Sequence, residues 1–199
     1  GAESTGKTTL AADLAAALTR DGLRVARVDE FLREFCETQG RTPRVDEQMG
    51  IAREQARRIE AAAAGHDIVI ADTTAIMIAV YSEHVFGDRS LYPEAEAAQQ
   101  RYQHTLLTAL DLPWEADGLQ RDGPHVREPV TALVRASLAR AAVPYAVVNG
   151  SGTDRLRNAL AAIGHIASEE AAAGQRWQWV CERCSDGDCE RHLLARGDR

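Results

Sequence analysis

The chain has 199 residues, 45% of them hydrophobic, and a formal net charge of −7 at pH 7 with a pI near 5.4. This length allows one α/β domain with a substantial core and a small appendage. The acidic balance argues against a duplex-binding protein, because phosphate backbones call for basic surfaces, and no apolar run approaches the roughly 20 residues of a membrane span. Three of the four cysteines are crowded near the C-terminus. This does not resemble a secreted disulfide framework, so we expect a cytoplasmic protein.

The first eight residues fit the P-loop pattern G-x-x-x-x-G-K-[ST] at every fixed position. Lys7 is the only lysine, whereas the other 22 of the 23 Lys and Arg residues are arginine. Because a planar guanidinium is too wide for a loop wrapped around a triphosphate, this single ammonium indicates nucleotide binding. We expect Lys7 to reach the β- and γ-phosphates and the Thr8 hydroxyl to bind Mg²⁺. The predicted ATP-binding residues are Gly1, Ala2, Glu3, Ser4, Thr5, Gly6, Lys7, Thr8 and Thr9.

The position of this motif raises an expectation about the sheet. A P-loop normally follows a buried strand in the middle of the sheet, and here Gly1 is the first residue. Either the natural protein continues upstream, or the sheet is built without its usual central strand.

Along the rest of the chain, apolar runs alternate with stretches of helix-forming residues. The clearest strand is predicted at residues 67–72, a β-branched run typical of a strand buried on both faces. Further strands are predicted at residues 24–28, 104–110 and 144–148, and helices at residues 8–18, 31–38, 45–64, 73–86, 94–102, 127–142 and 153–173. This alternation predicts an α/β fold of the P-loop NTPase class, with a parallel sheet and helices on both faces.

Polar residues follow each predicted strand, at the edge of the sheet where ligands bind. They include Asp29, Glu30, Asp72 and residues 111–114 and 149–150, and we expect them to converge on one cleft above the P-loop. Asp72 has the form of a Walker B carboxylate that holds Mg²⁺, with a helix N-cap as the alternative. Asp29 or Glu30 is a candidate to orient and deprotonate an attacking hydroxyl, and an exposed acidic turn is the alternative.

Two further segments carry candidate residues. Residues 113–127 combine glycine hinges with arginines and are predicted to form a lid, in which Arg121 neutralises charge on a transferring phosphate. Trp114 is a candidate to stack on a flat ring or to plug the domain edge. Arg33 is expected to pair with Asp29 or Glu30, as a surface ion pair or a substrate clamp.

Three blocks of sequence, in this order, resemble the NadR-type family of bacterial nicotinamide riboside kinase domains, a branch of the P-loop small-metabolite kinases. The blocks are Gly1-Ala2-Glu3-Ser4-Thr5-Gly6-Lys7-Thr8, Glu30-Phe31-Leu32-Arg33-Glu34-Phe35 and Pro113-Trp114-Glu115-Ala116-Asp117-Gly118-Leu119, and Asp72-Thr73 matches an acid–Thr pair of the family. The resemblance runs to about residue 163. It implies ATP-dependent phosphorylation of a ribosyl hydroxyl, with Glu30, Arg33, Trp114 and Asp117 at the substrate.

The chain departs from this family in two ways. Gln120 stands where the family usually has arginine, with Arg121 one residue later. The adenylyltransferase domain of the family, with its His-x-Gly-His motif, is absent from the chain. Relatives of this type are often known only as ATPases, so the riboside substrate is an inference from likeness.

The C-terminal residues form a separate predicted region. We expect a P-loop kinase domain at residues 1–173 and an appendage at residues 174–199, in which Cys181, Cys184, Cys189 and His192 offer a Cys₃His zinc site. The alternative is a disordered polar tail with incidental thiols. Cys36 is expected to be a small core residue.

The sequence therefore predicts an ATP- and Mg²⁺-dependent kinase of a small metabolite, with nicotinamide riboside as the leading substrate. The alternative is a regulatory P-loop ATPase that acts as a nucleotide-dependent switch on a protein partner. Neither nucleic acid nor a membrane is expected as a partner. The acceptor, the choice between Asp29 and Glu30 as base, and the oligomeric state stay open at this point.

Overall fold

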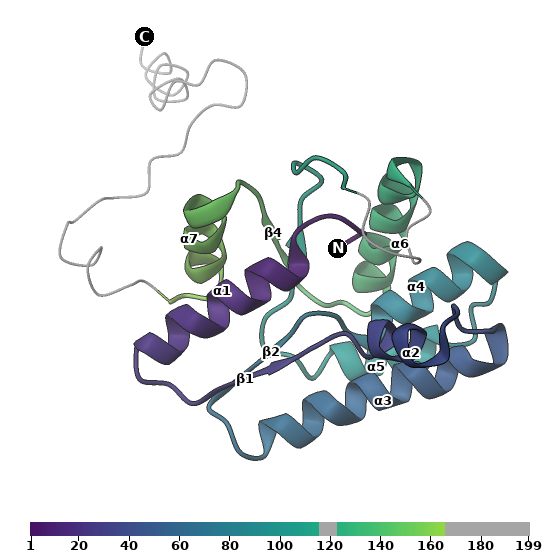
Figure 1. Cartoon of the computed structure of the whole chain (residues 1–199), viewed down its shortest axis with the longest axis horizontal. Helices are drawn as coiled ribbons and strands as arrows, with labels where there is room; N and C mark the ends of the chain where they lie inside the picture. The colour runs from purple at the N-terminus through teal and green to yellow at the C-terminus, as the bar shows by residue number, and fades with distance from the viewer. Residues whose placement is uncertain (116–122, 166–199) are drawn as a thin grey trace, which may run out of the picture. The chain divides into compact units, whose positions relative to one another are not determined.

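Every predicted strand and helix has a counterpart in the computed structural model, which describes residues 1–115 and 123–165. The helices are α1 (Lys7–Arg20), α2 (Phe31–Gln39), α3 (Val45–Ala63), α4 (Ala75–Phe86), α5 (Tyr92–Gln99), the 3₁₀ turn η2 (Pro124–Val126), α6 (Arg127–Arg140) and α7 (Gly152–Ala162). The strands are β1 (Val25–Val28), β2 (Ile68–Ala71), β3 (Leu106–Thr108) and β4 (Ala146–Val148) (Figure 1).

Several helix boundaries differ from the prediction, among them the ends of α5 at Gln99 and of α6 at Arg140, both earlier than expected. Helix α5 begins at Tyr92, earlier than expected, because Pro93 lies in the first turn, where its missing N–H would be unpaired anyway. Helix α4 begins at Ala75 rather than at Thr73, because Thr74 is its extended N-cap residue. Helix α7 ends at Ala162, so the predicted continuation through residues 163–165 is wrong. Residues 166–173 of that predicted helix lie outside the described part.

The strands form two parallel pairs. β1 pairs with β2 from Val25↔Ile68 to Val28↔Ala71, and β3 pairs with β4 from Leu106↔Ala146 to Thr108↔Val148. Within residues 1–115 and 123–165, no strand joins one pair to the other. A cavity of about 950 Å³ is lined by both β2 and β3, and by apolar side chains of α1.

The expectation that the strand at residues 67–72 is buried on both faces is wrong. All four residues of β2 are only partly buried. The physical reason is that, among the described residues, β2 pairs with another strand on one side only, and that β2 lines the cavity. The continuous apolar run is typical of an interior strand, but a strand is fully buried only when neighbouring strands flank it on both sides.

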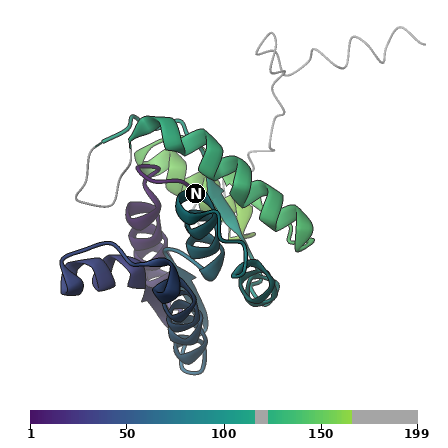
Figure 2. The ribbon, with the colours of Figure 1, turned by 90° about the vertical axis from the view of Figure 1, so that its right-hand side faces the viewer.

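Helices cover both faces of the β1–β2 pair, as expected for this fold class. Helix α1 contacts both strands from one face, and α3 contacts them from the other (Figure 1). Helix α4 lies among α3, α5 and α6 and contacts all three (Figures 1 and 2). Its first six residues, from Ala75 to Val80, are all buried and form the centre of the larger core cluster. A helix that is apolar on all sides is stable only when it is enclosed in this way.

Among the described residues, no helix combines the length and the apolar character that a membrane crossing requires. Cys36 is buried, with its thiol not engaged in a disulfide, as the sequence predicts for a small core residue.

Candidate functional site

The P-loop wraps around the start of α1 with two residues in the left-handed backbone region. Gly6 has φ 68° and is the N-cap residue of α1, and Ser4 has φ 51°. No side chain caps α1, so no side chain competes for the unpaired N–H groups of its first turn, which are the groups that bind phosphate at a helix N-terminus. The Lys7 ammonium donates a hydrogen bond to the carbonyl oxygen of Ala2 (2.8 Å) and so lies back over the loop.

The predicted metal ligands Thr8 and Asp72 lie in direct contact. Thr8 Oγ1 donates to Asp72 Oδ2 at 2.6 Å. The second oxygen of Asp72, Oδ1, is buried and has no hydrogen-bond partner among the residues that the structure describes. A buried carboxylate oxygen without a partner is costly, and together with an adjacent hydroxyl it matches the oxygen ligands that Mg²⁺ takes beside nucleotide phosphates. The residues therefore fit a magnesium ion.

The nucleotide site itself lies at one end of the large cavity. Gly1, Lys7 and Asp72 line that end, whereas more than half of the other lining residues are apolar. Buried phosphate charge needs donors and cations, and the arginines elsewhere in the lining, Arg53, Arg57 and Arg101, are already paired with glutamates. We therefore assign the P-loop end, and not the body of the cavity, to the phosphates.

A buried arginine that sequence reasoning missed braces the P-loop from behind. Arg155, in the first turn of α7, donates from Nη2 to the Thr5 carbonyl oxygen at 2.7 Å. Its Nη1 donates to Asp111 Oδ1 at 3.0 Å and to the Gly150 carbonyl oxygen at 2.7 Å. Burial alone would raise the pKa of Asp111, but the hydrogen bonds from Arg155 and the Gly150 N–H outweigh it and lower that pKa. The sequence did place residues 111–114 and 149–150 at this edge, but it gave no role to Arg155.

The P-loop also holds the loop that follows β3. Glu115 N–H donates to Ser4 Oγ at 2.8 Å, and Gly123 N–H donates to Glu3 Oε1 at 3.2 Å. Leu112 packs so closely on Gly6 that a Cβ at Gly6 would lie 2.9 Å from Leu112 Cδ1. The variable positions of the P-loop motif, Glu3 and Ser4, therefore contact this loop on both sides of residues 116–122.

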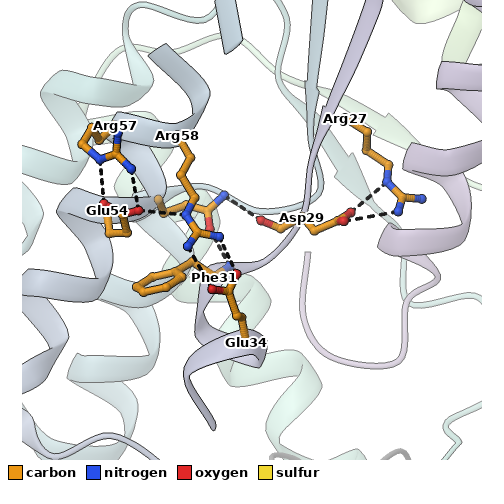
Figure 3. A network of polar contacts seen from close by, with 8 residues as sticks. Arg27, Asp29, Phe31, Glu34, Glu54, Arg57 and Arg58 are labelled. Carbon is orange, nitrogen blue, oxygen red and sulfur yellow. Dashed lines mark hydrogen bonds and ion pairs between the residues drawn. The ribbon is translucent and has the colours of Figure 1, made fainter. Parts of the chain in front are cut away.

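The acidic turn after β1 separates its two carboxylates. The Asp29 carboxylate pairs with Arg27 at 2.8 Å, and its side chain is 65% exposed (Figure 3). Glu30 is partly buried at the N-cap of α2. The turn therefore presents two carboxylates in different environments, one exposed and one partly buried.

Arg27 pairs with the Asp29 carboxylate, because side chains two positions apart along an extended chain lie on the same face. The expected pairing of Arg33 with Asp29 or Glu30 stays a prediction.

The remaining candidate residues divide into described and undescribed ones. Trp114 is partly buried, and its indole N–H has no hydrogen-bond partner. Thr9 is exposed on α1. Arg121, Asp117, Cys181, Cys184, Cys189 and His192 lie outside the described residues, so the predicted roles of the lid arginine and of the zinc site stay predictions. In the described part of the chain, no group of three or more His, Cys, Asp or Glu side chains could hold a metal ion.

These contacts join three of the expected strand ends to the P-loop, and the convergence of Asp29 and Glu30 on the same cleft stays a prediction. Asp72 touches Thr8, Asp111 and Gly150 meet Thr5 through Arg155, and Glu115 meets Ser4. A loop with this geometry, on an α/β fold with parallel strands, is the phosphate-binding element of a nucleotide-binding domain.

Comparison with known proteins agrees with this geometry. A family model described as an AAA domain matches residues 1–155, which include the whole P-loop and end at Arg155. Among curated proteins, none matches the chain. The chain belongs to this AAA domain family and is a P-loop nucleotide-binding domain.

Proposed function

We propose that this domain is an ATP-dependent kinase that phosphorylates a hydroxyl group of a small metabolite, a riboside such as nicotinamide riboside. The observation that carries the proposal is the position of a second acidic site, the turn at Asp29 and Glu30, beside the metal carboxylate of Asp72. The turn at Asp29 and Glu30 and the carboxylate of Asp72 follow two strands that pair directly with each other. A domain that only binds nucleotide needs the metal carboxylate of Asp72, but it does not need the acidic turn at Asp29 and Glu30.

In the proposed mechanism, the P-loop N–H groups and Lys7 bind the triphosphate and hold its γ-phosphate in place. Thr8 and Asp72 would hold Mg²⁺, which neutralises charge on the β- and γ-phosphates when bound. Glu30 accepts the proton of the acceptor hydroxyl as its oxygen forms a bond to the γ-phosphorus. The bond between that phosphorus and the bridging oxygen breaks at the same time, and ADP leaves with the electron pair.

Glu30 suits the role of base better than Asp29. Asp29 is exposed and paired with Arg27, whereas Glu30 is partly buried at the N-cap of α2. The resemblance to nicotinamide riboside kinases supports the same choice, because Glu30 begins the second matching block.

The test is ADP release from MgATP in the presence of a panel of ribosides, with product phosphorylation followed by mass spectrometry. The proposal expects one riboside, nicotinamide riboside first, to stimulate ADP release and to gain one phosphate. Slow ADP release that is indifferent to every riboside would refute the kinase and favour the nucleotide-dependent switch. Phosphorylation of a different small hydroxyl compound would keep the kinase and correct the acceptor.

A further inference from the structure

Gln55, on α3, is a fully buried polar residue for which the sequence suggested no role. Its exposed fraction is 0%. The side-chain oxygen accepts a hydrogen bond from Phe31 N–H at 2.8 Å. The side-chain nitrogen donates to the carbonyl oxygen of Asp29 at 3.3 Å and to that of Thr73 at 3.2 Å. One side chain thus joins the residues that follow β1 to those that follow β2.

These bonds use both N–H groups of the amide and fix its orientation. If the side-chain oxygen and nitrogen were exchanged, one donor would face a donor and two acceptors would face an acceptor. Burying an amide costs free energy that a well-packed apolar side chain would avoid. The hydrogen bonds offset this cost only if all partners stay in place. A glutamine at this position therefore stabilises the arrangement of the two loops that it connects more than it stabilises the core.

Gln55 lies where the strand ladder ends. The last regular bond of the β1–β2 pair runs from Asp72 N–H to the Val28 carbonyl oxygen at 3.0 Å. One residue further along each strand, the Gln55 amide binds the Asp29 and Thr73 carbonyl groups. The side-chain amide thus extends the ladder like one additional peptide group, and it holds the two strand ends together past the point where they separate.

The next turn of α3 braces the same segment from outside. The Arg58 guanidinium lies over the Phe31 ring, 4.3 Å from its centroid, and donates to Glu34 Oε1 at 3.0 Å (Figure 3). Arg58 is held in turn by Glu54 at 2.8 Å. These contacts fix the start of α2 against α3, and so they fix the turn between β1 and α2 at its far end.

We propose that Gln55 is a positioning residue that sets the placement of the Asp29–Glu30 turn relative to the metal carboxylate Asp72. The inference rests on the proposed function in assigning the turn to the attacking hydroxyl. The role of Gln55 is the same whether the attacking hydroxyl belongs to a metabolite or to water, because both must be oriented toward the same γ-phosphate. Gln55 itself contacts the backbone of the two loops and acts through them.

The test replaces Gln55 by methionine, which has a similar length and no hydrogen-bonding amide. The readouts are kcat for ADP release, with and without the riboside, and the Kd of MgATP from equilibrium titration. We expect kcat to fall roughly 10- to 100-fold, as for a misplacement of about 1 Å in a reacting group. The Kd of MgATP should be unchanged, because the P-loop, Lys7 and Thr8 do not contact Gln55.

A matched control is Gln99→Met, on α5. Gln99 is also buried and bridges two residues, accepting from Thr74 Oγ1 at 2.7 Å and donating to Thr105 Oγ1 at 2.9 Å. It makes none of these bonds to the Asp29–Glu30 turn. We expect this variant to lose stability to urea as Gln55→Met does, while its kcat stays at the wild-type value. An equal fall of kcat in both variants would assign Gln55 to general stability and overturn the proposal.

A double variant separates the positioning role from an independent effect. If Gln55 acts through the turn, Glu30→Gln lowers kcat strongly in the wild-type background and only slightly in the Gln55→Met background. Multiplicative effects of the two substitutions would overturn the proposal. If no riboside stimulates the wild-type protein, the kinase proposal fails. The role of Gln55 is then tested on basal ATP hydrolysis, where Gln55→Met should lower kcat by the same factor. An unchanged rate of basal hydrolysis would overturn the proposal for Gln55.

Discussion

Thr8 Oγ1 donates a hydrogen bond to Asp72 Oδ2 at 2.6 Å, and this contact joins residues 64 positions apart in the chain. It links the first turn of α1 to the residue that follows β2. Because Asp72 Oδ1 is buried without a partner among the described residues, the pair could bind a cation, and we propose the Mg²⁺ of a bound nucleotide.

The first prediction concerns this pair. Asp72→Asn keeps the size of the side chain and removes its charge, so the gain in nucleotide affinity on adding Mg²⁺ should fall by roughly 10- to 150-fold, the value of about 1.5–3 kcal/mol for a bond to a charged group. Titration of ATP with Mg²⁺ and with EDTA measures this gain. Thr19→Val, a change at an exposed residue in the last turn of α1, is the control and should leave the gain intact. A full Mg²⁺ effect in Asp72→Asn would remove Asp72 from the site.

The second prediction concerns Lys7. Lys7→Ala should weaken ATP binding by roughly 10- to 150-fold, because one charge-assisted bond to phosphate is lost. Lys7→Arg should not restore binding, since the planar guanidinium does not fit over the Ala2 carbonyl group where the ammonium lies. Isothermal titration with ATP tests both variants. Wild-type affinity in Lys7→Arg would show that charge alone is required there.

The third prediction separates the two carboxylates of the acidic turn. Glu30→Gln should lower kcat for phosphoryl transfer by about 10²- to 10⁴-fold, the usual contribution of a general base. Asp29→Asn should have a small effect, because its carboxylate is exposed and paired with Arg27. The assay is ADP release with the stimulating riboside at saturation. If Asp29→Asn has the larger effect, the base is misassigned.

The fourth prediction concerns the brace behind the P-loop. Arg155→Met should lower the free energy of unfolding by about 3 kcal/mol, because it leaves buried partners at Thr5, Gly150 and Asp111 without their donor. It should weaken ATP binding as well, since the Thr5 carbonyl group loses its anchor. Urea unfolding and ATP titration measure the two effects. Arg157→Met, on the same helix but exposed and paired with Asp154 at 2.7 Å, should change stability by only about 0.3–0.5 kcal/mol.

The fifth prediction is a pH dependence at the start of α3. Hydrogen bonds from the Arg41 side chain, and then from the Arg44 N–H, lower the pKa of Glu47 from 4.5 to about 2. A depressed pKa means that the carboxylate stabilises the fold above pH 4.5, and that this contribution is lost as the pH falls from 4.5 through 2. The difference in urea stability between the wild type and Glu47→Gln should therefore be constant from pH 7 to 5 and shrink toward pH 2. A constant difference down to pH 2 would contradict this pairing.

The fold class and the P-loop were predictable because they depend on local patterns. Gly6, Lys7 and Thr8 specify a loop whose geometry is set by its own backbone, and the alternation of strands and helices specifies a parallel sheet. Asp72 was predictable for the same reason, since it directly follows a continuous apolar run.

Gln55 and Arg155 were not predictable, because their roles depend on contacts between distant segments. Gln55 lies in a helix rich in Gln, Glu and Arg, where nothing distinguishes a buried amide from the exposed ones around it. Arg155 resembles any arginine in the first turn of a helix. The extra pattern that could have marked Gln55 is its spacing from Ile51 and Ile59, four residues on either side, which places it on the apolar face.

The two strand pairs have a further physical consequence. Among the described residues, β2 pairs only with β1, and β3 pairs only with β4, so each of the two inner strands has one edge whose backbone N–H and C=O groups have no partner strand. Such an edge is a template on which a further extended segment can pair. Because β2 leads directly to Asp72, a segment that paired there would also support the nucleotide-binding edge.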